Sequence, residues 1–245
     1  MNTNQTIEKL KSLRLNAMAQ LYQHHIQNNL YNDITPDEYI ALLADHEWEE
    51  RQNKKIQRLI TQGAFRQKAS IAEVDFVSAR NLDKNMFKRL ATLGFIAKKE
   101  NIILTGSSGV GKSFLVQAIG HEACLKGLKS KYYIAARLFS ALKLAKIDGT
   151  YSKELKKLQK IDLLILDDFG LQAFDNYARE ALMDIIEDRY NIKSTIVSSQ
   201  IPVAAWYELI GEGTIADAIL DRLVNSSHRI ELNGESLRKT ILTQQ

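Results

Sequence analysis

The stretch NIILTGSSGVGKSFLVQAIG, residues 101–120, constrains this chain more than any other part of the sequence. An apolar run leads into a loop in which Gly106, Gly111, Lys112 and Ser113 fit G-x-x-x-x-G-K-[ST]. In that pattern backbone N–H groups surround a phosphate, and the lysine reaches the outer phosphates. Apolar residues at helical spacing follow from Phe114, so we predict a strand, a loop and a helix whose N-terminus binds phosphate. A structural turn is the alternative, although the fixed positions match by chance in only about one such chain in a hundred.

Short strand-like runs alternate with helical patterns from Asn101 onward, namely NIILTG, SKYYIAA, DLLILDD, STIVSSQ and SHRIEL. Strands joined through helices need crossover connections, which predicts an α/β fold with a mostly parallel sheet. Before residue 75 the patterns are only helical, and one of them opens with Thr35 as N-cap and Pro36 at the first helical position. We therefore expect a small all-helical N-terminal domain, residues 1–75, followed by a P-loop α/β domain, residues 76–245.

A second motif, IDLLILDDFG, ends a predicted buried strand in the paired acids Asp167 and Asp168. The first carboxylate of such a pair can hold Mg²⁺, and the second can orient or deprotonate an attacking water. Alone, the pair could simply cap the end of a strand. Together with the glycine loop it predicts a nucleotide hydrolase.

Two further stretches extend the predicted site. The run STIVSSQIP ends in Ser198, Ser199 and Gln200, at the carboxyl end of a strand, where the γ-phosphate and its water are expected. Arg222 lies on a predicted helix before the last strand, from which an arginine finger could reach the nucleotide of a neighbouring subunit. The alternatives are a polar strand end before a proline turn and a solvated helix residue.

These motifs, in this order, resemble the AAA+ ATPases, and closely the branch that contains DnaC-like and IstB-like proteins. The leading LKSLRLNAMA and the tail HRIELNGESLRK are similar to the IstB-like helper ATPases of bacterial insertion sequences in particular. The resemblance implies a three-layer P-loop AAA+ domain that binds ATP and Mg²⁺. Too little sequence follows Arg222 for the full helical lid of the wider group, which leaves Arg238 as the candidate for the sensor-2 arginine.

The resemblance also implies a role for each motif residue. Lys112 and Ser113 would contact phosphates and Mg²⁺, Asp167 would hold Mg²⁺, and Asp168 would position water. Gln200 or Ser198 would sense the γ-phosphate, and Arg222 would act on a neighbour's nucleotide. The expected nucleotide-binding residues are Gly106, Ser107, Ser108, Gly109, Val110, Gly111, Lys112, Ser113 and Phe114.

Two basic stripes suggest what the nucleotide controls. Residues 51–72 contain basic side chains and no acid, and a second lysine-rich segment precedes the strand that bears the paired acids. Solvated surface lysines explain a single stripe, whereas two stripes favour sequence-independent contact with a DNA backbone. We interpret Trp48, Tyr132 and Tyr133 as core aromatics. The candidate DNA-binding residues are Arg51, Lys54, Lys55, Arg58, Lys143, Lys146, Lys153, Lys156 and Lys157.

Composition narrows the other possibilities. The 245 residues include 33 Lys plus Arg against 29 Asp plus Glu, a balance that permits a polyanionic partner without requiring one. The single cysteine, Cys124, excludes an internal disulfide framework, and the histidines lack metal-ligand spacing. No run approaches a membrane span and no signal pattern opens the chain, so we expect a cytoplasmic protein.

The sequence thus predicts an ATP-dependent, Mg²⁺-requiring helper of DNA transposition that binds duplex DNA, forms a head-to-tail homo-oligomer and recruits a transposase. The first alternative is a replicative-helicase loader with the same nucleotide switch. A small-molecule P-loop kinase is a second alternative, disfavoured because no substrate lid is apparent and the basic stripes would lack a purpose.

Overall fold

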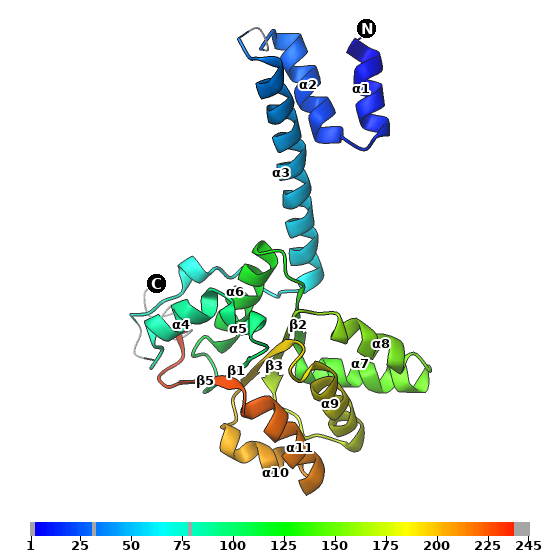
Figure 1. Cartoon of the computed structure of the whole chain (residues 1–245). Helices are drawn as coiled ribbons and strands as arrows, with labels where there is room; N and C mark the ends of the chain where they lie inside the picture. Colours follow the sequence, from blue (N-terminus) through cyan, green and yellow to red (C-terminus); the bar gives the residue numbers. More distant parts are fainter. Residues whose placement is uncertain (1–2, 31–32, 78–79, 238–245) are drawn as a thin grey trace. The chain divides into compact units, whose positions relative to one another are not determined.

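The computed structural model describes residues 3–30, 33–77 and 80–237 (Figure 1). The chain divides into two compact units, Met1–Arg58 and Leu59–Gln245. The domain boundary predicted between residues 75 and 76 lies within the second unit, and as a boundary between functional domains it stays a prediction. None of the helices in the described ranges is long and apolar enough to cross a membrane.

The first unit is built from helices α1 (Thr3–Ser12) and α2 (Asn16–Asn28) and most of α3 (Pro36–Gly63). As predicted, Pro36 is the first residue of α3 and Thr35 caps it. Glu38 N donates to Thr35 Oγ1 at 3.4 Å, and in return Thr35 N donates to Glu38 Oε2 at 3.0 Å. Glu47 of α3 caps α2, since its Oε2 accepts from Ala17 N at 2.9 Å and Met18 N at 3.0 Å. This carboxylate therefore ties α2 to α3.

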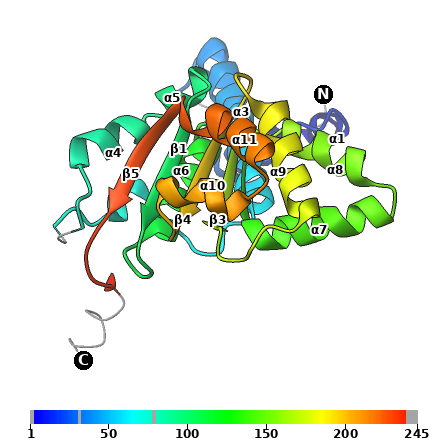
Figure 2. The same ribbon diagram turned by 90° about the horizontal axis from the view of Figure 1, so that it is seen from below.

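The second unit contains a parallel sheet with the strand order β2-β3-β4-β1-β5 (Figures 1 and 2). Every pairing is parallel, so the carboxyl ends of the strands share one edge. The register places Ile134 beside Asp167 and Thr105 beside Ser199 at that edge. The predicted strands are confirmed, with bounds β1 Asn101–Gly106, β2 Ser130–Ile134, β3 Leu163–Phe169, β4 Ser194–Ser199 and β5 Ser227–Leu232.

Helices cover both faces of this sheet and make three layers (Figures 1 and 2). Successive strand residues point to opposite faces, so Leu164 and Leu166 pack with α7 to α11, whereas Leu163 and Ile165 pack with α4 to α6. The predicted α/β P-loop architecture is confirmed. The helix bounds are α4 Lys84–Ala91, α5 Gly94–Ala97, α6 Lys112–Leu125, α7 Ala135–Ile147, α8 Tyr151–Gln159, α9 Asn176–Arg189, α10 Trp206–Ile210 and α11 Gly213–Val224, with 3-10 turns η1 Ile71–Glu73 and η2 Val203–Ala205.

Candidate nucleotide-binding site

The glycine loop joins the end of β1 to the start of α6, as the sequence predicts. Gly111 precedes the first residue of α6 with φ +93°, a left-handed conformation that side chains resist. At Gly106 a Cβ atom would lie 2.3 Å from the carbonyl oxygen of Leu232 in β5. Only glycine allows these approaches, and the loop consequently leaves the N–H groups at the N-terminus of α6 available to an anion.

Lys112 is the first residue of α6 and is only 6% exposed. Its Nζ donates to Gly106 O at 2.7 Å and to Ser107 O at 2.8 Å. Burial lowers the pKa of this ammonium group, and the charges of Asp167 and Asp168 act in the opposite direction. Two carbonyl groups thus hold the lysine ammonium over the loop. A phosphate bound there would be a stronger partner for it, because a phosphate carries full negative charge.

Asp167 and Asp168 lie near the carboxyl end of β3, two residues and one residue before its last residue, Phe169. Asp167 is 1% exposed, and both of its oxygens accept hydrogen bonds: Oδ2 from the Tyr132 hydroxyl at 2.8 Å and Oδ1 from Asp168 N at 2.9 Å. Asp168 follows with φ +55°, where the register between β3 and β4 shifts. Because of this irregular backbone, the two carboxylates lie in different environments. Asp167 is buried and oriented by hydrogen bonds, whereas Asp168 lines a cleft.

That cleft has a volume of about 690 Å³, within the range of small-molecule sites. It brings together the phosphate loop and helix α6, the end of β3 and the residue after β4. The segment just after α3 adds Arg66 and Gln67. The remaining lining residues are Ser108, Gly109, Gly111, Lys112, Ser113, Phe114, Gln117, Tyr132, Asp168, Leu171, Gln200 and Leu237.

The family model of the IstB-like ATP binding protein matches residues 8–244 of this chain. The chain belongs to this family. An insertion sequence ATP-binding protein of Sinorhizobium fredii is similar, with 42% identity over 234 residues that cover 96% of each chain.

Solved structures share the fold of this IstB-like chain. DnaI matches with a TM-score of 0.57 and 25% identity, over 72% of this chain and 93% of DnaI. A replication initiator DnaA bound to AMPPCP and single-stranded DNA matches with a TM-score of 0.60 and 19% identity, over 74% of this chain and 55% of DnaA. The predicted P-loop AAA+ class is confirmed by these likenesses and by the family.

The predicted γ-phosphate sensors differ in where they lie. Gln200 lines the cleft, whereas Ser198 is fully buried in β4. Ser199 Oγ donates to Phe169 O at 2.7 Å and accepts from Ile201 N at 3.0 Å, so it connects the ends of β3 and β4. Of these side chains, Gln200 is the one that the structure brings to the cleft. Its role as a sensor stays a prediction.

Arg222 of α11 is absent from the described lining of the cleft in its own chain. Its Nε lies 2.7 Å from Glu187 Oε2 of α9, its Nη1 donates to Ala218 O at 3.0 Å, and its guanidinium lies 5.9 Å from the centre of the Tyr190 ring. Arg238, the sensor-2 candidate, lies outside the described residues.

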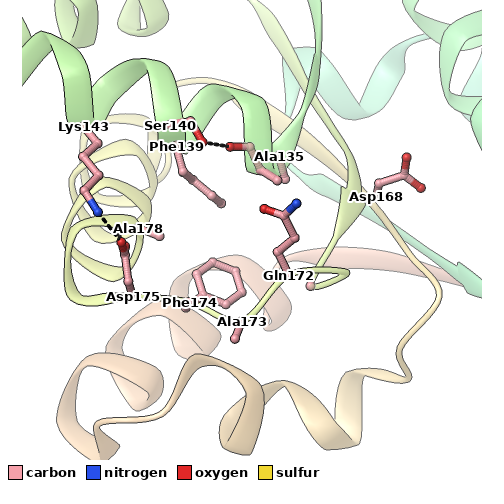
Figure 3. Close-up of a pocket in the computed structure, with 12 residues that line it drawn as sticks. Ala135, Phe139, Ser140, Lys143, Asp168, Gln172, Ala173, Phe174, Asp175 and Ala178 are labelled. Carbon is pink, nitrogen blue, oxygen red and sulfur yellow. Dashed lines mark hydrogen bonds and ion pairs between the residues drawn. The ribbon is translucent and has the colours of Figure 1, made fainter.

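The candidate DNA-binding residues are partly engaged in ion pairs. Lys143 and Lys146 of α7 pair with Asp175 and Glu180, and Figure 3 shows Lys143 directed toward Asp175 beside a pocket of about 140 Å³ next to Asp168. Three more pairs are Arg51 with Glu47, Lys54 with Glu50, and Lys157 with Glu154. Within the described part of the chain, no ion pair includes Lys55, Arg58, Lys153 or Lys156.

The aromatic predictions have different outcomes. Trp48 was predicted to lie in the core, but its position on α3 leaves it 63% exposed. Tyr132 is buried as predicted, but its hydrogen bond to Asp167 has no local signal in the sequence. Burial and the charge of Asp167 raise the pKa of the Tyr132 phenol, so it stays a neutral donor.

Proposed function

We propose that this IstB-like protein is an ATP-dependent helper of DNA transposition, which hydrolyses ATP, assembles on duplex DNA, and recruits and stimulates a transposase. The cleft that gathers Lys112, Ser113, Asp168 and Gln200 carries the proposal, because it joins groups suited to phosphate, metal and water. The family supports ATP as the ligand, and the Sinorhizobium fredii relative supports a role beside an insertion sequence.

In the proposed reaction the phosphates of ATP lie on the glycine loop, and Lys112 exchanges the carbonyls of Gly106 and Ser107 for the outer phosphates. Ser113 and Asp167 would hold Mg²⁺, and their hard oxygen atoms are of the kind that this ion prefers. The ion would neutralise charge on the outer phosphates. Asp168 orients the attacking water and Gln200 contacts the γ-phosphate. We infer that this hydrolysis acts as a switch between DNA-bound states.

The nucleotide part of this proposal is tested with Lys112→Ala. It should abolish tight ATP binding because the loop loses its cation, whereas Lys126→Ala, at the far end of α6, should bind ATP as the wild type does. Binding is measured by calorimetry on the full chain with Mg²⁺. Equal affinities in the two variants would contradict the proposed site.

Assembly is supported by the place of Arg222. Since it is not among the described residues that line its own cleft, an arginine-finger role requires the cleft of another subunit. Such a contact joins unlike surfaces, and repeated contacts of this kind produce rings or helical filaments. We therefore propose a head-to-tail homo-oligomer.

DNA binding is supported by the exposed cations on α8 and α3. Lys153 and Lys156 lie one turn apart on α8 and are free of ion pairs in the described ranges, as are Lys55 and Arg58 on α3. Contacts of such side chains with phosphates give affinity without reading the sequence. The expected ligand is therefore duplex DNA of arbitrary sequence.

The choice of partner separates this proposal from a replicative-helicase loader, the alternative with the same nucleotide switch. Long duplex DNA is incubated with the protein and ATP, and then with either the transposase encoded beside it or the host replicative helicase. The helper should retain the transposase only with ATP, and Lys112→Ala should retain neither. Retention of the helicase without the transposase would favour the loader.

A further inference from the structure

The segment that follows α3 is fixed against the phosphate-loop helix α6. Gln117 of α6 is 2% exposed, and its Oε1 accepts from Arg66 N at 2.7 Å and from Gln67 N at 3.3 Å. Its Nε2 donates to Ser113 O at 2.9 Å. One buried amide therefore joins the backbone of Arg66 to the residue expected to bind Mg²⁺.

Neighbouring contacts hold the same segment. Phe65 packs over Gly120, where a Cβ atom would lie 2.7 Å from Phe65 Cε1, and its ring centre lies 6.2 Å from that of His121. Lys131 Nζ donates to Gln62 O at 2.6 Å in the last turn of α3. All of these residues belong to the Leu59–Gln245 unit. The backbone position of Arg66 is consequently fixed by packing at Phe65 and by hydrogen bonds at residues 62, 66 and 67.

The Arg66 side chain lines the same cleft as Lys112 and Ser113 and is exposed to solvent. No ion pair among the described residues includes it. Tyr132 lines the same cleft, and its hydroxyl donates to Asp167 Oδ2 at 2.8 Å. Because Gln117 joins the Arg66 backbone to Ser113, which is proposed to hold Mg²⁺, Arg66 lies on the side of the cleft proposed for the outer phosphates.

We propose that Arg66 binds the outermost phosphate of ATP in its own subunit, as a second cation beside Lys112. A guanidinium suits this task, because its planar set of N–H donors matches phosphate oxygens and its charge persists at any physiological pH. The inference rests on the proposed nucleotide site and deepens it, since it makes Arg66 a residue that distinguishes ATP from ADP.

The test compares Arg66→Ala, Arg66→Lys and the control Lys68→Ala. Lys68 is an exposed cation on the same segment, and it is not one of the described residues that line the cleft. Affinities for ATP and ADP are measured by calorimetry on the full chain with Mg²⁺. Arg66→Ala should weaken ATP binding about tenfold, with ADP within about twofold of wild type, because one charge-assisted hydrogen-bonding group is lost. Arg66→Lys should recover part of the difference, and Lys68→Ala should match the wild type.

The outcomes distinguish this inference from the proposed function. If the wild type and Lys112→Ala bind ATP equally, the nucleotide site itself is wrong. If the wild type binds ATP and Arg66→Ala binds it equally well, or loses ATP and ADP equally, Arg66 does not contact the outermost phosphate. Thermal melting of each variant checks that it folds. If Arg66→Ala does not fold, the ratio of ATP affinity to ADP affinity in Arg66→Lys decides instead. A ratio equal to that of the wild type would contradict the inference.

Discussion

Arg222 is held within its own chain by contacts that an arginine finger has to give up. The ion pair with Glu187 is partly exposed, since 26% of the arginine side chain and 55% of the glutamate side chain are accessible. Exposed pairs of this kind stabilise a protein by about 0.2–1 kcal/mol, because solvent screens them and ordering two long side chains costs entropy. The hydrogen bond from Arg222 Nη1 to Ala218 O adds a contact of similar size.

Breaking these contacts of Arg222 therefore costs little free energy compared with the transition-state stabilisation that an arginine finger provides. We expect Glu187→Gln to keep the ATPase activity of the assembled protein or to raise it by at most about fivefold, the factor that 1 kcal/mol represents. Arg222→Ala should bind ATP normally yet hydrolyse it about a thousandfold more slowly, the loss typical of a missing arginine finger. Arg229→Ala, an exposed arginine on β5, is the matched control and should behave as the wild type.

The assay is steady-state ATP hydrolysis on duplex DNA at several protein concentrations. Mixing Arg222→Ala with Lys112→Ala should restore part of the activity, because some interfaces then join an intact loop to an intact arginine. An absence of recovery while subunits exchange would refute the action in trans. If Glu187→Gln lost as much activity as Arg222→Ala, the ion pair itself would be the functional unit.

Three further predictions follow from the cleft and from α8. Asp168→Asn should keep ATP bound but slow its hydrolysis, as measured by separate binding and turnover assays, and normal turnover would remove Asp168 from the mechanism. Tyr132→Phe should raise several-fold the Mg²⁺ concentration needed for half-maximal ATP affinity, because Asp167 loses the donor that orients it; an unchanged Mg²⁺ titration would make the hydrogen bond purely structural. Replacing Lys153 and Lys156 by Ala should weaken binding to all duplex sequences alike and reduce the salt slope by roughly one per phosphate contact, and an unchanged slope would count against α8.

The sequence predicted the parts of the molecule that depend on local spacing. The glycine loop was recognisable because Gly106, Gly111 and Lys112 stand at fixed intervals, and the strands because β-branched and apolar runs alternate with helices. The meeting of Asp168 and Gln200 at one cleft followed from a general property of parallel sheets, whose carboxyl ends share an edge.

Contacts between distant elements could not be predicted in this way. Tyr132 meets Asp167 because β2 lies beside β3, and no local pattern predicts a contact between residues 35 positions apart in the sequence. Arg66 reaches the cleft through the packing of Phe65 and the hydrogen bond that Arg66 N donates to Gln117 Oε1, neither of which has a local signature. Helical periodicity predicts which face of a helix a side chain occupies. It does not predict which residue of another element contacts that side chain.

The same distinction ranks the predicted DNA contacts. Lys143 and Lys146 on α7 have the spacing of Lys153 and Lys156 on α8, so periodicity treats the two pairs alike. Asp175 and Glu180, at the start of α9, form ion pairs with the two α7 lysines. A DNA backbone must compete with those carboxylates on α7, whereas at Lys153 and Lys156 of α8 it replaces only water and counterions. For equal spacing and equal charge, α8 should therefore supply more of the affinity for DNA than α7 does.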